Sequence, residues 1–275
     1  MRFGCCVSLL DDTILRLPQA GADYAETGFS TLRDLSLAQC RERAQALEEA
    51  GVPVPVMNLL FPGDLALVGP RADLPAVEDY LDQGLEKAAL FGVKKLVFGS
   101  GGARRVPEGF PKEAAWEQLL ALCREVIAPR MEQRGMVCCI EPLNQGECNI
   151  LNTCAEGFRL AQAVDRPGVR LLVDLYHFDL EEEPRPSLEQ YRGYLCHAHI
   201  ASAKNGASSP CPGTGRTTRS SSVTWRPPAT RERSPWRATC PAAWNRSKPP
   251  LRISGRCYKE NLPSRGGFLI CSNLF

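Results

Sequence analysis

Short apolar runs alternate with stretches of helical period through residues 1–203. A run of four to eight apolar residues bounded by turn-forming residues is typical of a strand, and apolar residues at consecutive positions are typical of a strand buried on both faces. We therefore expect buried, parallel strands at residues 1–8, 22–29, 52–58, 94–101, 136–144, 169–177 and 195–202.

Apolar residues also recur at helical spacing between these runs. One helical face in residues 74–92 collects Val77, Tyr80, Leu81, Leu85 and Ala88, and one in residues 112–127 collects Trp116, Leu119, Leu120, Cys123 and Ile127. Gly51, Gly92 and Gly135 each follow such a helix, where a left-handed residue is favoured. The repeated order of strand and helix fits a doubly wound sheet or an eight-stranded barrel. No Gly-rich phosphate motif follows the first expected strand, which argues against a dinucleotide-binding sheet.

Charge divides the chain into two unlike parts. The formal net charge is +2, but residues 1–203 hold 20 basic and 29 acidic residues, whereas residues 204–275 hold 13 basic residues and two acidic ones. We therefore expect a folded unit over residues 1–203 and an irregular tail, rich in Ser, Pro and Arg, over residues 204–275. The basic residues of the tail are scattered singly, so they give little indication of a nucleic-acid partner.

Several partners and compartments are disfavoured by the sequence. No basic-then-apolar leader opens the chain and no apolar run is long enough to span a bilayer, so we expect a cytoplasmic protein without a membrane partner. Of 13 cysteines, nine precede residue 204, and the pairs Cys5-Cys6 and Cys138-Cys139 lie inside expected strands. Neighbouring strand residues face opposite sides, so we interpret these as core thiols rather than disulfides or zinc ligands. A homo-oligomer is compatible with this composition.

Polar residues gather at the carboxyl ends of the expected strands. In a parallel β/α barrel all of these ends surround one mouth, where such barrels build active sites. The residues in question are Glu26, Asn58, Arg104, Arg105, Glu141, Asn144, Asp174, His177, His197 and His199.

Glu141 and Asp174 each follow a strongly apolar run, so each carboxylate is expected at the edge of a dry interior. A cation would relieve the cost of an unpaired charge there. His197 and His199 are two apart on a strand and face the same side, one as a ligand and the other as a hydrogen-bonding neighbour. Two carboxylates and an imidazole suit Mn, Mg or Co. The competing interpretation is that the carboxylates pair with Arg104, Arg105 or a helix N-terminus.

The motifs CIEPLN, VDLYH and HAHIAS resemble those of the sugar isomerase and epimerase superfamily with the xylose isomerase-like barrel, whose members include ketose 3-epimerases and hydroxypyruvate isomerases. GADYAE and FGSGGARRVP are also similar to that family, and the resemblance covers residues 1 to about 203. It implies a (β/α)8 TIM barrel, with the eighth β/α unit lost or disordered in this chain.

The resemblance also implies roles for individual residues. A divalent metal would be held by Glu141, Asp174 and His199, with a fourth carboxylate from the eighth strand. Glu141 would in addition serve as the catalytic acid and base, while Glu147 and His177 would hold substrate oxygens. The epimerases carry an arginine six residues after the metal histidine, where this chain has Asn205.

Together these features predict an isomerase or epimerase of a small keto sugar, sugar phosphate or hydroxyketo acid, which moves a proton beside a carbonyl through a metal-stabilised enediolate. A non-catalytic or degenerate sugar-binding barrel and a dehydratase remain alternatives. An endonuclease of the abasic-site type fits less well, because it uses three zinc ions and several histidines and this chain has three histidines in all. The acidic charge of residues 1–203 also disfavours a nucleic-acid surface.

The tail lacks the eighth strand that the family pattern requires. Translated in the frame that begins one nucleotide earlier, residues 234–238 can read Val-Ser-Val-Glu-Gly, with glutamate in place of Arg237. We therefore expect a frameshift that begins between residues 204 and 213, and an impaired enzyme. We also expect an open barrel, or one whose first and seventh strands are covered irregularly by the tail.

Overall fold

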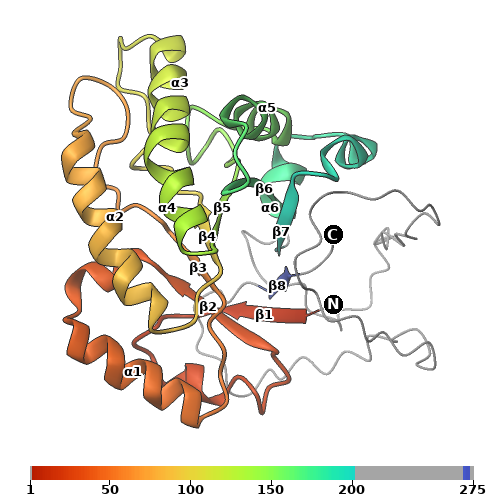
Figure 1. Cartoon of the computed structure of the whole chain (residues 1–275). Coiled ribbons are helices and arrows are strands. Elements are labelled where there is room, and N and C mark those ends of the chain that lie inside the picture. The colour runs from red at the N-terminus through yellow and green to blue at the C-terminus, as the bar shows by residue number, and fades with distance from the viewer. Residues whose placement is uncertain (1, 202–268, 273–275) are drawn as a thin grey trace. The chain divides into compact units, whose positions relative to one another are not determined.

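The computed structural model describes residues 2–201 and 269–272. Within these ranges seven parallel strands follow one another around a barrel, in chain order (Figure 1). Each strand expected from the sequence is present, and the parallel barrel is confirmed over the doubly wound sheet. The strands are β1 (Arg2–Cys6), β2 (Tyr24–Gly28), β3 (Val56–Asn58), β4 (Lys95–Phe98), β5 (Val137–Ile140), β6 (Val169–Asp174) and β7 (Leu195–Ile200).

Helices connect the strands on the outside of the barrel (Figure 1). Gly51, Gly92 and Gly135 have φ angles of 68°, 71° and 60°, which confirms the left-handed turns expected after helices. The helices are α1 (Leu37–Glu49), α2 (Leu74–Ala89), α3 (Lys112–Ala121), α4 (Ala128–Gln133), α5 (Cys154–Val164) and α6 (Leu175–Leu180). The short helical turns are η1 (Asp12–Arg16), η2 (Ser30–Asp34), η3 (Leu122–Ile127) and η4 (Arg185–Tyr191). Among the described residues, none of the helices combines the length and the apolar character needed to cross a bilayer.

A short antiparallel strand, β8 (Leu269–Ser272), closes the barrel between β1 and β7. The expectation of unpaired edges is therefore wrong: part of the tail covers both edges, although as a regular antiparallel strand and not irregularly. Four backbone residues of β8 satisfy hydrogen bonds that an open edge would leave exposed. Residues 230–240, for which we expected no regular eighth parallel strand, lie outside the described residues.

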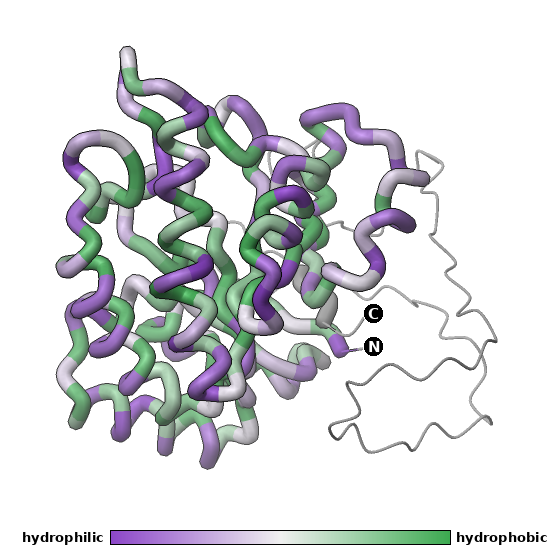
Figure 2. Tube along the Cα trace, turned by 45° about the horizontal axis from the view of Figure 1, so that its top comes forward, coloured by the Kyte–Doolittle hydropathy of each residue, from purple (hydrophilic) through white to green (hydrophobic). Residues whose placement is uncertain are grey.

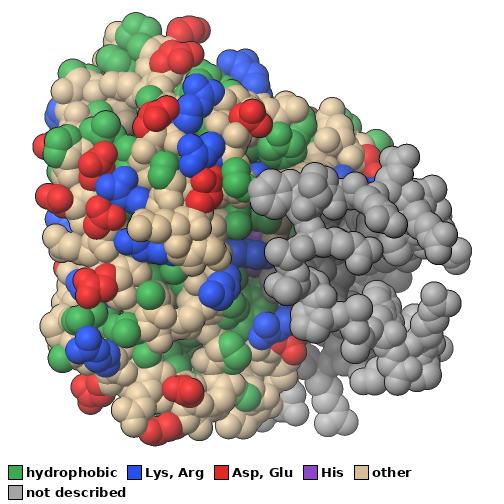
Figure 3. Space-filling model, in the orientation of Figure 1, with side chains coloured by type: hydrophobic (Ala, Val, Ile, Leu, Met, Phe, Trp, Pro, Cys, Tyr) green, Lys and Arg blue, Asp and Glu red, His purple; other side chains and the backbone are tan. Residues whose placement is uncertain are grey.

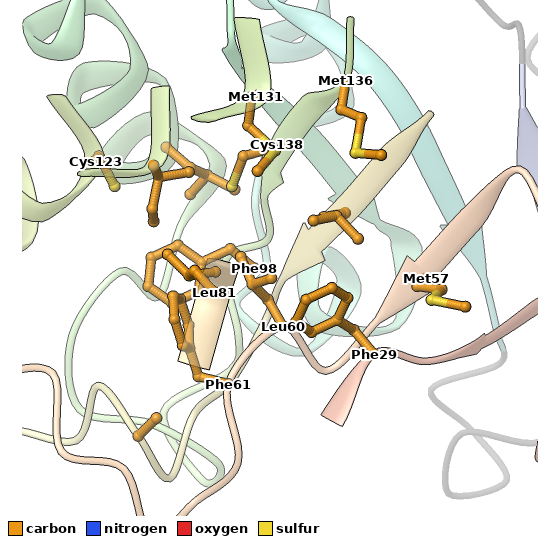
Figure 4. Packing of buried hydrophobic residues seen from close by; sticks show 14 of the residues in the cluster. Phe29, Met57, Leu60, Phe61, Leu81, Phe98, Cys123, Met131, Met136 and Cys138 are labelled. Atoms are coloured by element: carbon orange, nitrogen blue, oxygen red, sulfur yellow. The ribbon is translucent and has the colours of Figure 1, made fainter. Parts of the chain in front are cut away.

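Apolar packing occurs in two layers. Inside the barrel, Tyr24, Val56, Val97, Cys139 and Leu172 form one buried cluster. Outside it, the opposite faces of the strands pack against the helices, as shown by Phe61, Leu81, Phe98 and Met131 in Figure 4. Figure 2 shows that hydrophobic residues, in green, are frequent in the central segments, whereas the surrounding helices also carry many hydrophilic residues, in purple. The barrel interior is thus packed with apolar side chains from five strands.

The cysteines follow the interpretation drawn from the sequence. The nine between residues 2 and 201 are free thiols. Cys138 packs in the outer layer and its neighbour Cys139 in the inner cluster, which confirms that adjacent strand positions face opposite sides.

A bulge in β7 changes which residues face the interior. The register with β6 pairs Leu171 with Leu195 and then Leu172 with His197, so Cys196 is the extra residue. Two neighbouring side chains, Cys196 and His197, therefore contact the barrel interior: the Cys196 thiol lies 2.9 Å from Cys139 Sγ, and His197 bonds to a carboxylate of β2. After the bulge, alternation resumes and places His199 on the same side as His197, as expected.

Candidate metal centre

Two groups of side chains converge at the mouth of the barrel and share one histidine. Glu141, Asp174 and His199 form the first group, and Glu26, His197 and His199 form the second; within each group the potential ligand atoms lie within 4.8 Å of one another. Asp174 is the last residue of β6, Glu141 follows β5 directly, and His199 is the last residue but one of β7. Glu26 and His197 lie further back, in the middle of β2 and β7. The strand-end arrangement expected from the sequence thus brings the three predicted metal ligands together.

In the first group, His199 Nδ1 lies 2.8 Å from Glu141 Oε1 and 3.7 Å from Asp174 Oδ2. The three residues are buried but reach the surface, with exposed fractions of 8% for Glu141 and 6% for each of the others. Two carboxylates and one ring nitrogen therefore face a common point that is open to the mouth of the barrel.

Local structure orients Asp174. The expected strand over residues 169–177 ends at Asp174, because this residue caps the first turn of α6. Its Oδ1 accepts a hydrogen bond of 2.7 Å from the backbone nitrogen of Tyr176. Oδ2 remains directed to His199 and to His177, whose Nε2 lies 3.9 Å away.

Glu141 lies against a glycine at the end of β4. A Cβ atom added at Gly99 would approach Glu141 Oε2 to 2.1 Å, far inside any real contact. Only a residue without a side chain leaves room for this carboxylate, so the loop after β4 forms one wall of the site.

Arg104 and Arg105 do not form ion pairs with either carboxylate, so the competing interpretation from the sequence fails for them. Arg104 is fully buried and donates to the backbone oxygens of Phe98 and Glu141, each at 2.8 Å. Arg105 is exposed and donates to the backbone oxygen of Glu147. Arg104 therefore supports the backbone behind the site and is not available to a phosphate at the mouth.

The two residues expected to hold substrate oxygens lie together beside the first group. Asn144 joins them: its Nδ2 lies 2.8 Å from His177 Nδ1 and donates to Glu147 Oε1 at 3.0 Å. The Asn144 backbone nitrogen, which can only donate, also lies 3.2 Å from His177 Nδ1. His177 Nδ1 is therefore an acceptor, and the neutral ring carries its proton on Nε2, on the side of Asp174. The Glu147 side chain is half exposed.

The second group was not anticipated from the sequence. Glu26 was noted only as a polar residue at a strand end, yet it is fully buried and bonds to both His197 and His199. These partners are more than 170 positions away along the chain, so no local pattern could connect them. The available indication was a single glutamate at the end of the apolar run that forms β2.

Burial and pairing shift the pKa values of these groups in opposite senses. Burial alone would raise the pKa of Glu26, but the His199 charge and the two imidazole bonds outweigh burial and lower it far below its usual range. The same balance lowers the pKa of Asp174, through its interaction with His199. Burial tends to lower the pKa of His199, yet Glu26, Glu141 and Asp174 together raise it well above its ordinary value. Desolvation lowers the pKa of His197. The three carboxylates around His199 therefore favour its protonated form when no cation is bound.

The surface visible in Figure 3 has no extended patch of a single charge sign among the described residues. On the face shown in Figure 3, acidic and basic side chains of the described residues are interspersed. A nucleic-acid surface would require a continuous basic patch there.

Residues 15–224 match the family model described as "Xylose isomerase-like TIM barrel". Among curated proteins, a D-psicose 3-epimerase of Ruminiclostridium cellulolyticum is 32% identical over 106 residues, which cover 38% of this chain and 34% of the relative. A 3-dehydro-D-guloside 4-epimerase of Escherichia coli is 26% identical over 180 residues, or 63% of this chain and 68% of the relative. The match to the psicose epimerase thus spans about a third of that protein's length.

The fold is also similar to solved structures. A crystal structure of D-psicose 3-epimerase in the presence of D-fructose superposes with a TM-score of 0.67 and 19% identity, covering 79% of this chain and 77% of that one. At this identity the likeness shows the fold alone, and the chemistry has to be argued from the site.

Proposed function

The chain belongs to the xylose isomerase-like TIM barrel family, and from this premise we propose that it is a metal-dependent isomerase or epimerase of a small carbohydrate. The reaction would move a proton at the carbon next to a carbonyl in a keto sugar, sugar phosphate or hydroxyketo acid. The observation that carries the proposal is the convergence of Glu141, Asp174 and His199, with His177 and Glu147 beside them.

The donor set fits a divalent cation. Two carboxylates and one imidazole nitrogen are buried, mutually close and without a lysine or arginine partner among the described residues. Such a mixed oxygen and nitrogen set suits Mn, Mg or Co. Glu141, Asp174 and His199 would hold the ion, and its charge would neutralise the negative charge that develops on the substrate oxygens as the proton leaves.

Glu141 is proposed as the residue that removes and returns the proton. Its carboxylate is 8% exposed, so a substrate at the mouth can reach it, while Gly99 and Arg104 limit its movement. His177 would donate its Nε2 proton to a substrate oxygen, and the half-exposed Glu147 would accept from a hydroxyl group. Both groups are oriented by Asn144, so the substrate meets a preset pattern of donors and acceptors.

Epimerisation requires proton transfer on both faces of the reacting carbon, and one carboxylate serves one face. We propose that the second carboxylate belongs to the eighth strand of the unshifted reading frame, where this chain has Arg237. Arg237 lies outside the described residues. The chain as it stands is therefore expected to bind the cation and substrate but to turn over slowly.

A substrate screen tests this function. The frame-restored gene and the present gene would be expressed in parallel with Mn, Mg or Co, and solvent deuterium incorporation beside the carbonyl would be followed in ketoses, ketose phosphates and hydroxyketo acids. We expect exchange with the restored chain and its loss, by about 100-fold or more, in Glu141→Gln. Glu48→Gln, an exposed glutamate on α1, serves as the matched control with full activity.

Binding without exchange in the restored chain would contradict an isomerase and leave a sugar-binding barrel. Elimination of water from a hydroxyketo acid would instead identify a dehydratase on the same barrel.

A further inference from the structure

Glu26 has features that the proposed reaction does not use. It is completely buried, with an exposed fraction of 0%, at the inner face of β2. Around the barrel, β8 and β1 lie between β2 and β7. Among the described residues its ion-pair partners are the two histidines of β7 and no lysine or arginine. A buried carboxylate without a lysine or arginine partner destabilises the folded state unless hydrogen bonds compensate for its lost hydration.

The two oxygens of Glu26 contact two different histidines, and in each histidine the contact is made by Nε2. Oε1 lies 3.0 Å from His199 Nε2, and Oε2 lies 3.0 Å from His197 Nε2. An ionised carboxylate only accepts, so both Nε2 atoms must carry protons. The protonation pattern of both rings is therefore set by Glu26.

For His199, this pattern leaves Nδ1 as the ring nitrogen that can offer a lone pair to a cation. That atom is the one that faces Glu141 Oε1 and Asp174 Oδ2. If the ring carried its proton on Nδ1 alone, the lone pair would instead face Glu26, away from the other two ligands. The ring orientation in which Nε2 contacts Glu26 thus directs Nδ1 towards Glu141 and Asp174.

His197 completes the arrangement from the other side. Its Nδ1 is buried and has no hydrogen-bond partner among the described residues. A proton on that atom would be a buried donor without an acceptor, so the ring favours the Nε2 proton and keeps Glu26 in place.

We propose that Glu26 is a positioning residue that fixes the tautomer and the orientation of His199, and thereby the affinity of the site for a divalent cation, with His197 as the anchor of Glu26. The inference rests on the proposed function, because it takes Glu141, Asp174 and His199 as the ligands. The alternative, a second cation on Glu26, His197 and His199, is disfavoured because Glu26 is 0% and His197 1% exposed, and both Nε2 atoms already lie at hydrogen-bond distance from the Glu26 oxygens.

The histidines themselves provide the test, since the full chain contains only three. In the Mg²⁺-loaded protein, labelled with ¹⁵N at histidine, we expect His199 and His197 to be protonated at Nε2. In Glu26→Gln, the amide offers one acceptor and one donor, so one of the two rings should change to the Nδ1 proton. Two unchanged rings in this variant, or a wild-type His199 without an Nε2 proton, would overturn the proposal.

Metal affinity gives the second measurement. Titration with Mn²⁺, followed by the loss of the free-ion electron paramagnetic resonance signal, should show Glu26→Ala binding about 10- to 100-fold more weakly than the unchanged chain. Glu48→Ala is the matched control and should bind as the unchanged chain does. An unchanged affinity in Glu26→Ala, or two ions per chain with one lost in that variant, would refute the role of Glu26 alone. Failure of the unchanged chain to bind Mn²⁺ would refute the proposed function itself, and this inference with it.

Discussion

At the scale of single residues, the position of the Glu141 carboxylate depends on the absence of a side chain at Gly99, just after β4. Gly99 stands where any side chain would overlap Glu141 Oε2, and the Asp174 side chain divides its oxygens between a helix cap and the site. Both carboxylates are thus positioned by backbone features of the loops after β4 and β6. Their strand-end location could be read from the sequence, but these close contacts could not, because they join segments that are far apart along the chain.

The substitution Gly99→Ala should therefore reduce metal affinity more than it reduces the stability of the fold. The new methyl group displaces Glu141, and we expect Mn²⁺ affinity to fall by about tenfold or more, as when a group that orients a metal ligand is lost. Gly193→Ala is the control, because a Cβ there meets no atom within 4 Å. Calorimetric titration of both variants checks this expectation, and equal affinities would show that Glu141 is not confined by Gly99.

The raised pKa of His199 predicts pH-dependent metal binding. Below that pKa, a cation must displace the proton on Nδ1, so the apparent affinity is weak and each ion bound releases a proton; above it, the affinity levels off. Affinity should thus still be rising at pH values above about 6.5, near which the histidine of an unfolded chain titrates. Mn²⁺ titrations in two buffers of different ionisation enthalpy would count the protons released. A constant affinity and no proton release would contradict a proton on Nδ1.

At the scale of elements, Arg104 connects the ends of two strands. Its guanidinium group donates to the backbone oxygen of Phe98, the last residue of β4, and to that of Glu141, just after β5. It also lies 5.4 Å from the centre of the Phe98 ring. The two terminal nitrogens of the guanidinium group are thus bonded to backbone carbonyls, and the arginine stabilises the rim that carries the site.

Arg104→Ala should lower the free energy of unfolding by about 3 kcal/mol or more, because it leaves two buried carbonyl groups without a charged donor. Arg105→Ala, one position along the chain and exposed, should change it by about 0.5 kcal/mol or less. Urea denaturation of the two variants gives the comparison. Similar midpoints would contradict the structural role of Arg104.

Whether a segment forms a strand or a helix was predictable from the apolar pattern. The residues at which strands and helices begin and end were not always predictable. The run at residues 52–58 is a strand only from Val56, since Pro53 and Pro55 have no backbone N–H to donate. The helical period over residues 112–127 continues to Gln133, with a wider turn at η3 that the side-chain pattern does not encode. The bulge that turns Cys196 inward depends on pairing with β6, so it too escapes local reasoning.

At the scale of the whole molecule, residues 2–201 have strands and helices where the sequence pattern indicates them. The described part of the tail, residues 269–272, forms β8, which pairs antiparallel with β1 and β7. We propose, as before, that the reading frame changes between residues 204 and 213, which would account for the change of composition and charge in the sequence after residue 203.

The mass of the intact protein from the native source tests the frame. The account predicts a mass different from the 30.2 kDa of this chain, together with tail peptides that contain the glutamate in place of Arg237. Resequencing the gene is the control. An intact mass equal to that of the printed sequence would refute the frameshift and leave the barrel assignment untouched.

The central claim, that Glu141, Asp174 and His199 hold one divalent cation, is tested most directly by anomalous X-ray diffraction from crystals of the full chain soaked in Mn²⁺. The account predicts a single anomalous peak at the mouth of the barrel, bonded to the two carboxylates and to His199 Nδ1, with Glu26 bonded to His199 Nε2 behind it. A peak at Glu26 and His197, or no peak within bonding distance of Glu141 and Asp174, would contradict it.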